Sequence, residues 1–191
     1  MQGGKKKLRT LLLQRRLSLT LKEVAAKSKI IQQKIKDNIS LQAQDKIFIY
    51  FPIKNEVDTL ELIRFFWSQN IQVFLPNCSI LEQKMLFFKV KNFSQLKTGK
   101  YNIPEPDPKS CPSFQGTPPK IIFMPAVGFD KRLYRLGYGG GYYDRLLADP
   151  IFSNIQTIGL AYEFQIIARL PIDRWDIPLH KIFTEKNIYT R

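Results

Sequence analysis

The chain has 191 residues, of which 44% are hydrophobic and 13% aromatic, and this composition excludes a disordered or collagen-like protein. Its 30 Lys and Arg residues outnumber 16 Asp and Glu residues, giving a net charge of +14. The longest apolar runs, Ile47–Ile53 and Ile121–Val127, are far shorter than the ~20 residues of a membrane-spanning helix, and we find no secretory signal. The length suits one compact domain, residues 1–191.

Cysteine, histidine and charge narrow the class of protein further. Cys78 and Cys111 are too few for a disulfide framework or a metal set, and they indicate reduced thiols in a cytoplasmic protein. The single histidine, His180, argues against His-rich metal sites and a Ser-His-Asp triad. Residues 1–46 hold 12 basic and 3 acidic residues, which leaves +9 of the charge in the first quarter. Such a skew is typical of proteins that bind nucleic acid or a polyanionic small molecule, and equally of solvated helix faces.

The first half of the chain alternates helix and strand patterns. Leucines spaced by three or four predict a helix over 4–18, and Thr20 with Glu23 forms a capping box that opens a second helix ending near residue 39. Short runs rich in β-branched and aromatic residues predict strands. These strands are expected at 46–51, 71–75 and 85–90, with a helix over 58–69; Pro52 and Pro76 are expected to end the first two strands.

The second half begins with a long connection. Residues 98–119 contain six of the 12 prolines, and we expect an irregular loop that acts as a lid or is disordered. The later patterns predict strands at 121–124, 157–161 and 182–184 and helices at 141–148 and 163–169. Strands alternating with helices are typical of α/β proteins, so we predict one three-layer α/β/α domain with a mainly parallel central sheet that is mixed at its edge.

A glycine-rich loop carries the most chemical information. Four of the 10 glycines fall within Gly137–Gly141, between a strand and a helix. Glycine allows a ligand to approach the main chain closely, and free N–H groups at a helix start favour an anion. Arg135 can pair with phosphate, and Asp144 can hold a hard cation. The loop matches neither Walker A nor GxGxxG, since residue 142 is Tyr, and the same glycines are consistent with a simple tight turn.

The segment 121–147, IIFMPAVGFDKRLYRLGYGGGYYDRLL, resembles the signature of the 5-formyltetrahydrofolate cyclo-ligase family, approximately P-G-x-x-F-D followed by R-L-G-x-G-x-G-Y-Y-D. Ala126 stands where the family usually has Gly. The resemblance covers most of the chain. Its other matches are Lys5 with Arg9 in the basic first helix, Glu56 in the loop after the first strand, the Ile103-Pro104-Glu105-Pro106 element, the segment 161–165, and Pro171 with Asp176. His180 replaces an acid that the family often carries four residues after that Asp.

The resemblance implies an enzyme that converts 5-formyltetrahydrofolate and MgATP into 5,10-methenyltetrahydrofolate, ADP and phosphate. It implies phosphorylation of the formyl oxygen followed by attack of N10 on the activated carbon. The implied ATP-binding residues are Lys5, Arg9, Arg135, Leu136, Gly137, Tyr138, Gly139, Gly140, Gly141, Tyr142 and Tyr143. The implied folate-binding residues are Phe51, Glu56, Tyr101, Tyr138 and Tyr142, and the implied Mg²⁺ ligands are Asp144 and Asp176.

Two alternative functions stay open. An ATP-binding relative on the same fold with a different formyl- or carboxyl-bearing substrate would share the glycine-rich loop, although Glu56 and the Pro104-Glu105 element favour folate. A basic nucleic-acid-binding module would explain the charge, but the chain lacks its usual signatures. We therefore expect a monomer that binds ATP and reduced folate, including polyglutamylated forms, and has no nucleic-acid or membrane partner.

Overall fold

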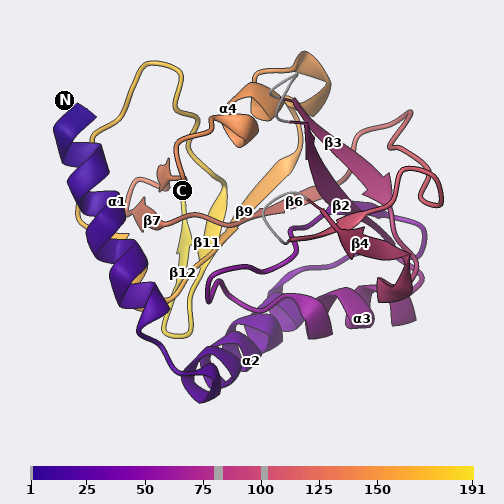
Figure 1. Cartoon of the computed structure of the whole chain (residues 1–191), viewed down its shortest axis with the longest axis horizontal. Coiled ribbons are helices and arrows are strands. Elements are labelled where there is room, and N and C mark those ends of the chain that lie inside the picture. The colour runs from indigo at the N-terminus through magenta and orange to yellow at the C-terminus, as the bar shows by residue number, and fades with distance from the viewer. Residues whose placement is uncertain (1, 80–83, 100–102) are drawn as a thin grey trace.

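A seven-stranded sheet lies at the centre of the computed structural model, which describes residues 2–79, 84–99 and 103–191 (Figure 1). The strand order is β12-β11-β9-β6-β1-β2-β3. The five inner strands are parallel, while β3 and β12 pair antiparallel at the two edges. The strands are β1 (Lys46–Phe48), β2 (Gln72–Ser79), β3 (Lys84–Lys89), β6 (Ile121–Met124), β9 (Gln156–Leu160), β11 (Lys181–Phe183) and β12 (Ile188–Thr190). The predicted mainly parallel sheet with mixed edges is confirmed.

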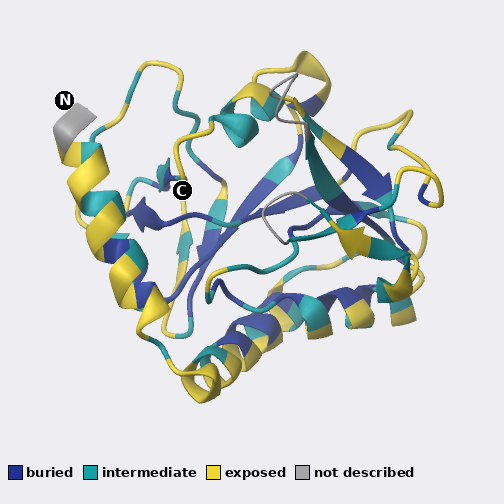
Figure 2. Cartoon of the chain, viewed as in Figure 1, coloured by how far each residue is buried: buried dark blue, intermediate teal, exposed yellow. Residues whose placement is uncertain are grey.

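Helices cover both faces of this sheet, as expected for three layers. Ile47 and Ile49 pack on the face covered by α2 (Leu21–Asn38) and α3 (Leu60–Ser68), whereas Phe48 faces the opposite core beside α4 (Tyr142–Leu147). Side chains of successive strand residues point to opposite faces, so this alternation separates the two cores. Figure 2 shows the strands largely buried and the outward side of α1 (Gln2–Leu17) exposed.

Four of the five predicted helices, those at 4–18, 20–39, 58–69 and 141–148, are present with ends shifted by no more than two residues. The start of α2 is the best-defined case. The Thr20 hydroxyl accepts a hydrogen bond from the Glu23 N–H at 3.2 Å, and the Glu23 carboxylate accepts one from the Thr20 N–H at 2.8 Å. The capping box therefore satisfies donors that have no partner inside the helix. No helix of the described residues is long and apolar enough to cross a bilayer.

The prediction that Pro76 ends a strand is wrong, because β2 continues to Ser79. Pro76 pairs opposite Phe87 of β3. On the other side of β2, β1 already ends at Phe48, which pairs with Phe74. The Ile49 N–H still donates to the Phe74 carbonyl at 3.1 Å, but the next bond of a parallel ladder would need the N–H that Pro76 lacks. The pairing with β1 therefore stops there, while the ladder with β3 carries the strand onward.

Three further expectations need correction. The predicted helix 163–169 is only a 3₁₀ turn at Glu163–Gln165, because β10 (Ile166–Ile167) pairs with β7 (Gly128–Asp130), which also pairs with β8 (Arg135–Leu136). The connection 98–119 contains β5 (Pro104–Pro106), which pairs with β4 (Leu96–Thr98). The edge strand β12 was not predicted. Elements of two or three residues are defined by pairing with distant segments, which sequence periodicity does not reveal.

Gly159 is expected to be essential for packing between β9 and its neighbours. A Cβ atom there would lie 2.6 Å from Cε1 of Phe129 and 2.9 Å from Cδ1 of Leu179. Gly159→Ala should lower the free energy of unfolding by about 1–3 kcal/mol in a denaturant titration, because an overpacked core must shift. Gly4→Ala is the control, since nothing lies within 4 Å of the added atom. It should raise stability by about 0.5–1 kcal/mol, and equal effects of the two changes would contradict the packing argument.

Candidate active site

The candidate site lies where the connections of the sheet diverge. The neighbouring strands β1 and β6 run parallel, but β1 leads to β2 on one side and β6 leads to β9 on the other. In open α/β sheets, ligands bind beyond the carboxyl ends of strands at such a switch point. The loop 49–59 follows β1 here and the loop 125–127 follows β6. Helix α1 lies against both loops, through the contacts described below.

Glu56 is the buried acid at this point, with 4% of its surface exposed. Its Oε1 accepts a hydrogen bond from the Tyr138 hydroxyl at 2.9 Å, and its Oε2 accepts one from the Ile53 N–H at 3.1 Å. A guanidinium nitrogen of Arg16 lies 3.8 Å from Oε1. Burial raises the pKa of Glu56 above its ordinary value, although the positive charge of Arg16 acts in the opposite direction. The carboxylate is thus held in one orientation inside the protein.

Arg16 joins three segments of the chain to that acid. Its side chain is buried, and it donates hydrogen bonds to the carbonyl oxygens of Lys54 at 2.9 Å and Ala126 at 3.0 Å. It also donates to the hydroxyl of Tyr138. Because the guanidinium group carries five donors in a rigid plane, one side chain can hold the loops after β1, β6 and β8 together.

A pocket of about 290 Å³ lies beside Glu56. Phe51 and the segment 52–55 form part of its wall, together with Val24 of α2. Lys54 and Asn55 both have left-handed backbone conformations, with φ of 48° and 55°, and the Asn55 amide donates to the carbonyl of Leu19 at 2.9 Å. The pocket therefore offers an aromatic ring and an acid at the carboxyl end of a strand. A larger hollow of about 700 Å³ lies along Gly4–Gln14 of α1, but no acid lines it.

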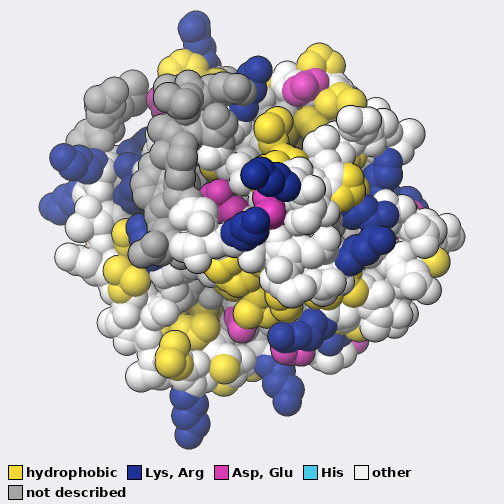
Figure 3. All heavy atoms as spheres, turned by 45° about the vertical axis from the view of Figure 1, so that its right-hand side comes forward, with side chains coloured by type: hydrophobic (Ala, Val, Ile, Leu, Met, Phe, Trp, Pro, Cys, Tyr) yellow, Lys and Arg dark blue, Asp and Glu magenta, His cyan; other side chains and the backbone are white. Residues whose placement is uncertain are grey.

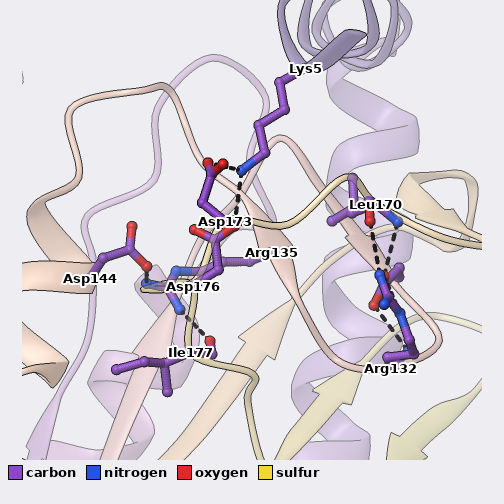
Figure 4. A network of polar contacts seen from close by, with 9 residues as sticks. Lys5, Arg132, Arg135, Asp144, Leu170, Asp173, Asp176 and Ile177 are labelled. Carbon is purple, nitrogen blue, oxygen red and sulfur yellow. Dashed lines mark hydrogen bonds and ion pairs between the residues drawn. The ribbon is translucent and has the colours of Figure 1, made fainter. Parts of the chain in front are cut away.

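A second cluster gathers charges from both ends of the chain (Figure 4). The Lys5 ammonium donates to the carboxylates of Asp173 at 2.6 Å and Asp176 at 2.9 Å. Burial lowers the pKa of Lys5, but the bonds to the two carboxylates outweigh it, so the pKa is raised overall. Lys5 therefore stays charged, and it ties α1 to the segment that precedes β11.

Arg135 and Asp144 form the other half of this cluster. Their side chains are paired, and Arg135 also donates to the carbonyl of Ile177 at 3.1 Å. Burial lowers the pKa of Arg135, whose side chain is 5% exposed, while the charge of Asp144 raises it. Burial also raises the pKa of Asp144, and the nearby charge of Asp176 adds to that effect. Two carboxylates thus lie close enough to repel one another.

The glycine-rich loop approaches α1 between these clusters. Arg9 donates to the carbonyl of Gly137 at 2.7 Å, and Gly139 and Gly141 have φ of 109° and 65°. Within the part of the chain that the structure describes, the N–H groups of Gly139, Gly140 and Gly141 donate to no other residue. Helix α4 has only six residues, so its dipole adds little. An anion here would depend on the loop N–H groups and the neighbouring cations.

Comparison with known proteins decides the family. Residues 1–185 match the model of the 5-formyltetrahydrofolate cyclo-ligase family. The chain belongs to this family. The cyclo-ligase of Haemophilus influenzae is 33% identical over 181 residues, which cover 93% of this chain and 96% of that protein. The cyclo-ligase of Mycoplasma pneumoniae is 32% identical over 184 residues, covering 95% and 99%.

Solved structures of 5,10-methenyltetrahydrofolate synthetases share the fold. The structure from Aquifex aeolicus has a TM-score of 0.81 and 31% identity, covering 97% of this chain and 92% of that one. A structure from Mycoplasma pneumoniae has a TM-score of 0.76 and 28% identity, covering 95% and 98%. The expected α/β fold and cyclo-ligase activity are thereby confirmed, and the chain is a ligase of folate metabolism.

The structure brings some of the predicted site residues into two groups. Lys5, Arg135, Asp144 and Asp176 form the charged cluster, while Glu56 and Tyr138 meet beside the pocket that Phe51 lines. Of the other predicted residues, Tyr142 lies near the Arg145 guanidinium, Tyr143 packs against the core, Leu136 is buried, and Tyr101 lies outside the described residues. Their ligand contacts stay predictions.

Sequence reasoning missed three residues that the structure places against the candidate site residues. Arg16 was counted only among the basic residues, although it follows Arg9 by seven positions and therefore lies on the same helix face. Asp173 lies three residues before Asp176, where its acid type was the only signal. The Tyr162 hydroxyl donates to the backbone carbonyl of Glu56 at 3.0 Å, and no motif indicated that contact.

His180 lies at the amino ends of the parallel strands, whereas Glu56 lies beyond their carboxyl ends. Its Nδ1 accepts a hydrogen bond from the N–H of Thr157, near the start of β9, at 3.0 Å, and it directly precedes β11. Burial lowers its pKa. In this structure the residue that replaces the usual acid links two strands at their amino ends.

Folding stability is expected to depend on the ionisation of Glu56. Burial raises the pKa of this carboxyl group, with Arg16 opposing. A raised pKa stabilises the folded state fully below the unfolded pKa, and this contribution is lost as the pH rises through the folded pKa. Glu56→Gln lacks it. The stability advantage of the wild type over Glu56→Gln should therefore be larger at about pH 4 than at about pH 8 in urea titrations. A constant difference would contradict the raised pKa.

Proposed function

We propose that the protein catalyses the ATP- and Mg²⁺-dependent cyclisation of 5-formyltetrahydrofolate to 5,10-methenyltetrahydrofolate, with release of ADP and phosphate. The observation that carries this proposal is the part-buried hydrogen bond that the Tyr138 hydroxyl donates to the Glu56 carboxylate. It joins the glycine-rich loop to the loop that lines the pocket. A nucleotide on the first loop and a folate in the second would thus be neighbours, as direct phosphoryl transfer requires.

The folate would occupy the pocket beside Glu56. A buried carboxylate is a strong acceptor for the N–H groups of a pterin ring, and Phe51 offers a flat surface for stacking. The pocket is at the small end of ligand sites, which span about 300–1,000 Å³, and it suits a bicyclic ring better than a whole folate. The benzoyl-glutamate part would then extend toward the surface.

The triphosphate would lie against the glycine-rich loop and the cations around it. Arg9 already contacts Gly137, and Lys5 and Arg135 lie within the charged cluster. Lys5 and Arg135 could each exchange a carboxylate partner for a phosphate oxygen. Phosphoryl transfer needs alignment and charge stabilisation more than covalent help from the protein. These cations and the free loop N–H groups would supply both.

Asp144 and Asp176 fit a magnesium ion. One oxygen of each carboxylate is engaged, by Arg135 and by Lys5, while the other accepts no hydrogen bond from a described residue. Burial raises the pKa of Asp144, and the charge of Asp176 adds to this effect; a bound cation would relieve the repulsion between the two carboxylates. The described residues hold no group of three or more candidate ligands, but Mg²⁺ usually keeps several waters and takes one or two carboxylates. When bound, it would neutralise charge on the phosphate oxygens.

The chemistry follows from the poor reactivity of an amide-like formyl group. Its oxygen attacks the γ-phosphorus of ATP, the bond to ADP breaks, and an imino-phosphate forms. N10 then attacks the formyl carbon, the carbon–oxygen bond breaks, phosphate leaves, and N10 loses its proton. The protein needs to hold the reacting groups in line and exclude water, and no catalytic base is required.

We further propose that the enzyme acts as a cytoplasmic monomer without a nucleic-acid partner. Cys78 and Cys111 are free thiols, which supports a reducing compartment. Figure 3 shows Lys and Arg side chains at several separate places on one face rather than in a single patch. A continuous basic stripe would be expected of a nucleic-acid-binding surface.

The deciding experiment follows methenyl product by its near-ultraviolet absorbance. Product should form from 5-formyltetrahydrofolate only when ATP and Mg²⁺ are both present. Nucleotide binding without product would contradict the folate reaction and favour a relative with another substrate. Tight RNA or DNA binding that weakens steeply with salt would instead support the nucleic-acid alternative.

A further inference from the structure

Arg16 is a buried cation for which neither the proposed binding of phosphate nor that of folate has a use. Its side chain is 1% exposed, which is rare for arginine unless it is fully paired. Burying a charge costs several kcal/mol when its partners are imperfect, and a packed apolar side chain could fill the same space. The guanidinium group therefore calls for a role beyond the stability of the fold.

The donor and acceptor of each hydrogen bond between Arg16, Tyr138 and Glu56 can be assigned from the chemistry of the three groups. Arg16 has donors only, and an ionised Glu56 has acceptors only. The Tyr138 hydroxyl lies between them, so it accepts from Arg16 and donates its proton to Glu56. The two ends of this chain, Arg16 and Glu56, are buried, while the Tyr138 residue between them is 39% exposed. Each bond of such a chain polarises the next and thereby strengthens it. The position of the phenol is thus set from both sides.

This chain of bonds connects the two halves of the site. Tyr138 belongs to the glycine-rich loop at 137–141, and Glu56 belongs to the loop that lines the pocket. Arg16 also holds the carbonyls of Lys54 and Ala126, so both neighbouring loops are tied to one rigid group. A ligand that orders either loop would order the other through bonds already in place.

We propose that Arg16 is a positioning residue that, through the Tyr138 hydroxyl and the Glu56 carboxylate, makes nucleotide binding and folate binding strengthen each other. This inference rests on the proposed function and adds an energetic coupling between its two ligand sites. Such coupling is reciprocal, because each ligand must change the affinity of the other by the same factor.

Isothermal titration calorimetry measures this factor directly. A non-hydrolysable ATP analogue with Mg²⁺ is titrated into the protein with and without saturating 5-formyltetrahydrofolate, and the reverse titration gives the folate affinity. In the wild type, each ligand should tighten the other by at least about fivefold. The two titrations must agree, which provides an internal check.

Two variants test the proposed route. Tyr138→Phe keeps the ring, over which the Arg16 guanidinium lies at 5.6 Å, and removes only the hydroxyl. Arg16→Lys keeps the charge but cannot reach all of the acceptors. In both variants the coupling factor, a ratio of two affinities of the same variant, should fall close to one whatever the affinity for each ligand alone. Tyr134→Phe, on the same hairpin, is the control and should keep the wild-type factor. Thermal unfolding checks that each variant is folded.

The outcomes separate this inference from the proposed function. If the wild type binds neither ligand, the proposed function itself fails. If both ligands bind but neither affects the other, or if Tyr138→Phe keeps the full factor, the coupling through this hydroxyl is overturned. Full coupling in Arg16→Lys with none in Tyr138→Phe would overturn the role of Arg16. If Arg16→Lys does not fold, Tyr138→Phe, which removes no buried charge, decides whether the coupling depends on this hydroxyl.

Discussion

An Asp144→Asn enzyme is expected to fold normally and to lose turnover by about 100-fold or more, the usual effect of removing one electrostatic group from a reaction centre. Asparagine has the shape of aspartate and still offers Arg135 an acceptor, so the buried guanidinium keeps a partner. It lacks the negative charge that would hold Mg²⁺ and orient Arg135. The effect should therefore fall on turnover and on the Mg²⁺ concentration required.

The measurement combines steady-state rates over a Mg²⁺ titration with urea unfolding. Asp149→Asn is the matched control: Asp149 caps the 3₁₀ turn Pro150–Phe152 through the Ile151 N–H, and asparagine caps equally well. The control should retain activity. Arg135→Ala should also lose turnover far more than stability, although its loss leaves Asp144 unpaired. A normally folded Asp144→Asn enzyme with full rate would remove Asp144 from the mechanism.

Glu56→Gln should raise the KM for folate by about 2- to 30-fold, because a charged acceptor contributes more to a hydrogen bond than a neutral one, ~1.5–3 kcal/mol against ~1 kcal/mol. Glutamine also presents an N–H₂ group toward ring N–H donors. The affinity for the nucleotide alone should change little, since the charged cluster around Lys5 and Arg135 is left intact.

Calorimetry with each ligand by itself distinguishes a direct contact between Glu56 and folate from a role of Glu56 in maintaining the shape of the site. Folate affinity should fall while affinity for the ATP analogue, measured without folate, stays within about twofold of the wild type. Glu61→Gln, an exposed change on α3 that affects only an ion pair with Arg64, is the control and should change neither. Equal weakening of both ligands by Glu56→Gln would show that this acid maintains the shape of the site.

The elements that were predicted correctly have strong local signals. The capping box at Thr20 and Glu23 defines the start of α2 within the chain itself, and the apolar run at Ile121–Met124 forms the buried strand β6 as expected. The segment Ile166–Ile167 lacked such a signal, because its strand exists only through pairing with Phe129 and Asp130. Local patterns therefore identified the elements that have an apolar run or a cap of their own, including the three-residue strands β1 and β11, and missed strands such as β10 that depend on pairing alone.

The same division holds for the site. The sequence alone predicted the glycine-rich loop and the acids Glu56, Asp144 and Asp176 as site residues, because their types and order resemble the motifs of the family to which the chain belongs. Only the tertiary structure decided what these groups contact. Lys5 meets Asp173 across 168 positions, and Arg16 meets Ala126 across 110. Helix and strand periodicities extend over a few residues, whereas such pairs form when packing of the sheet and α1 brings distant loops to one edge.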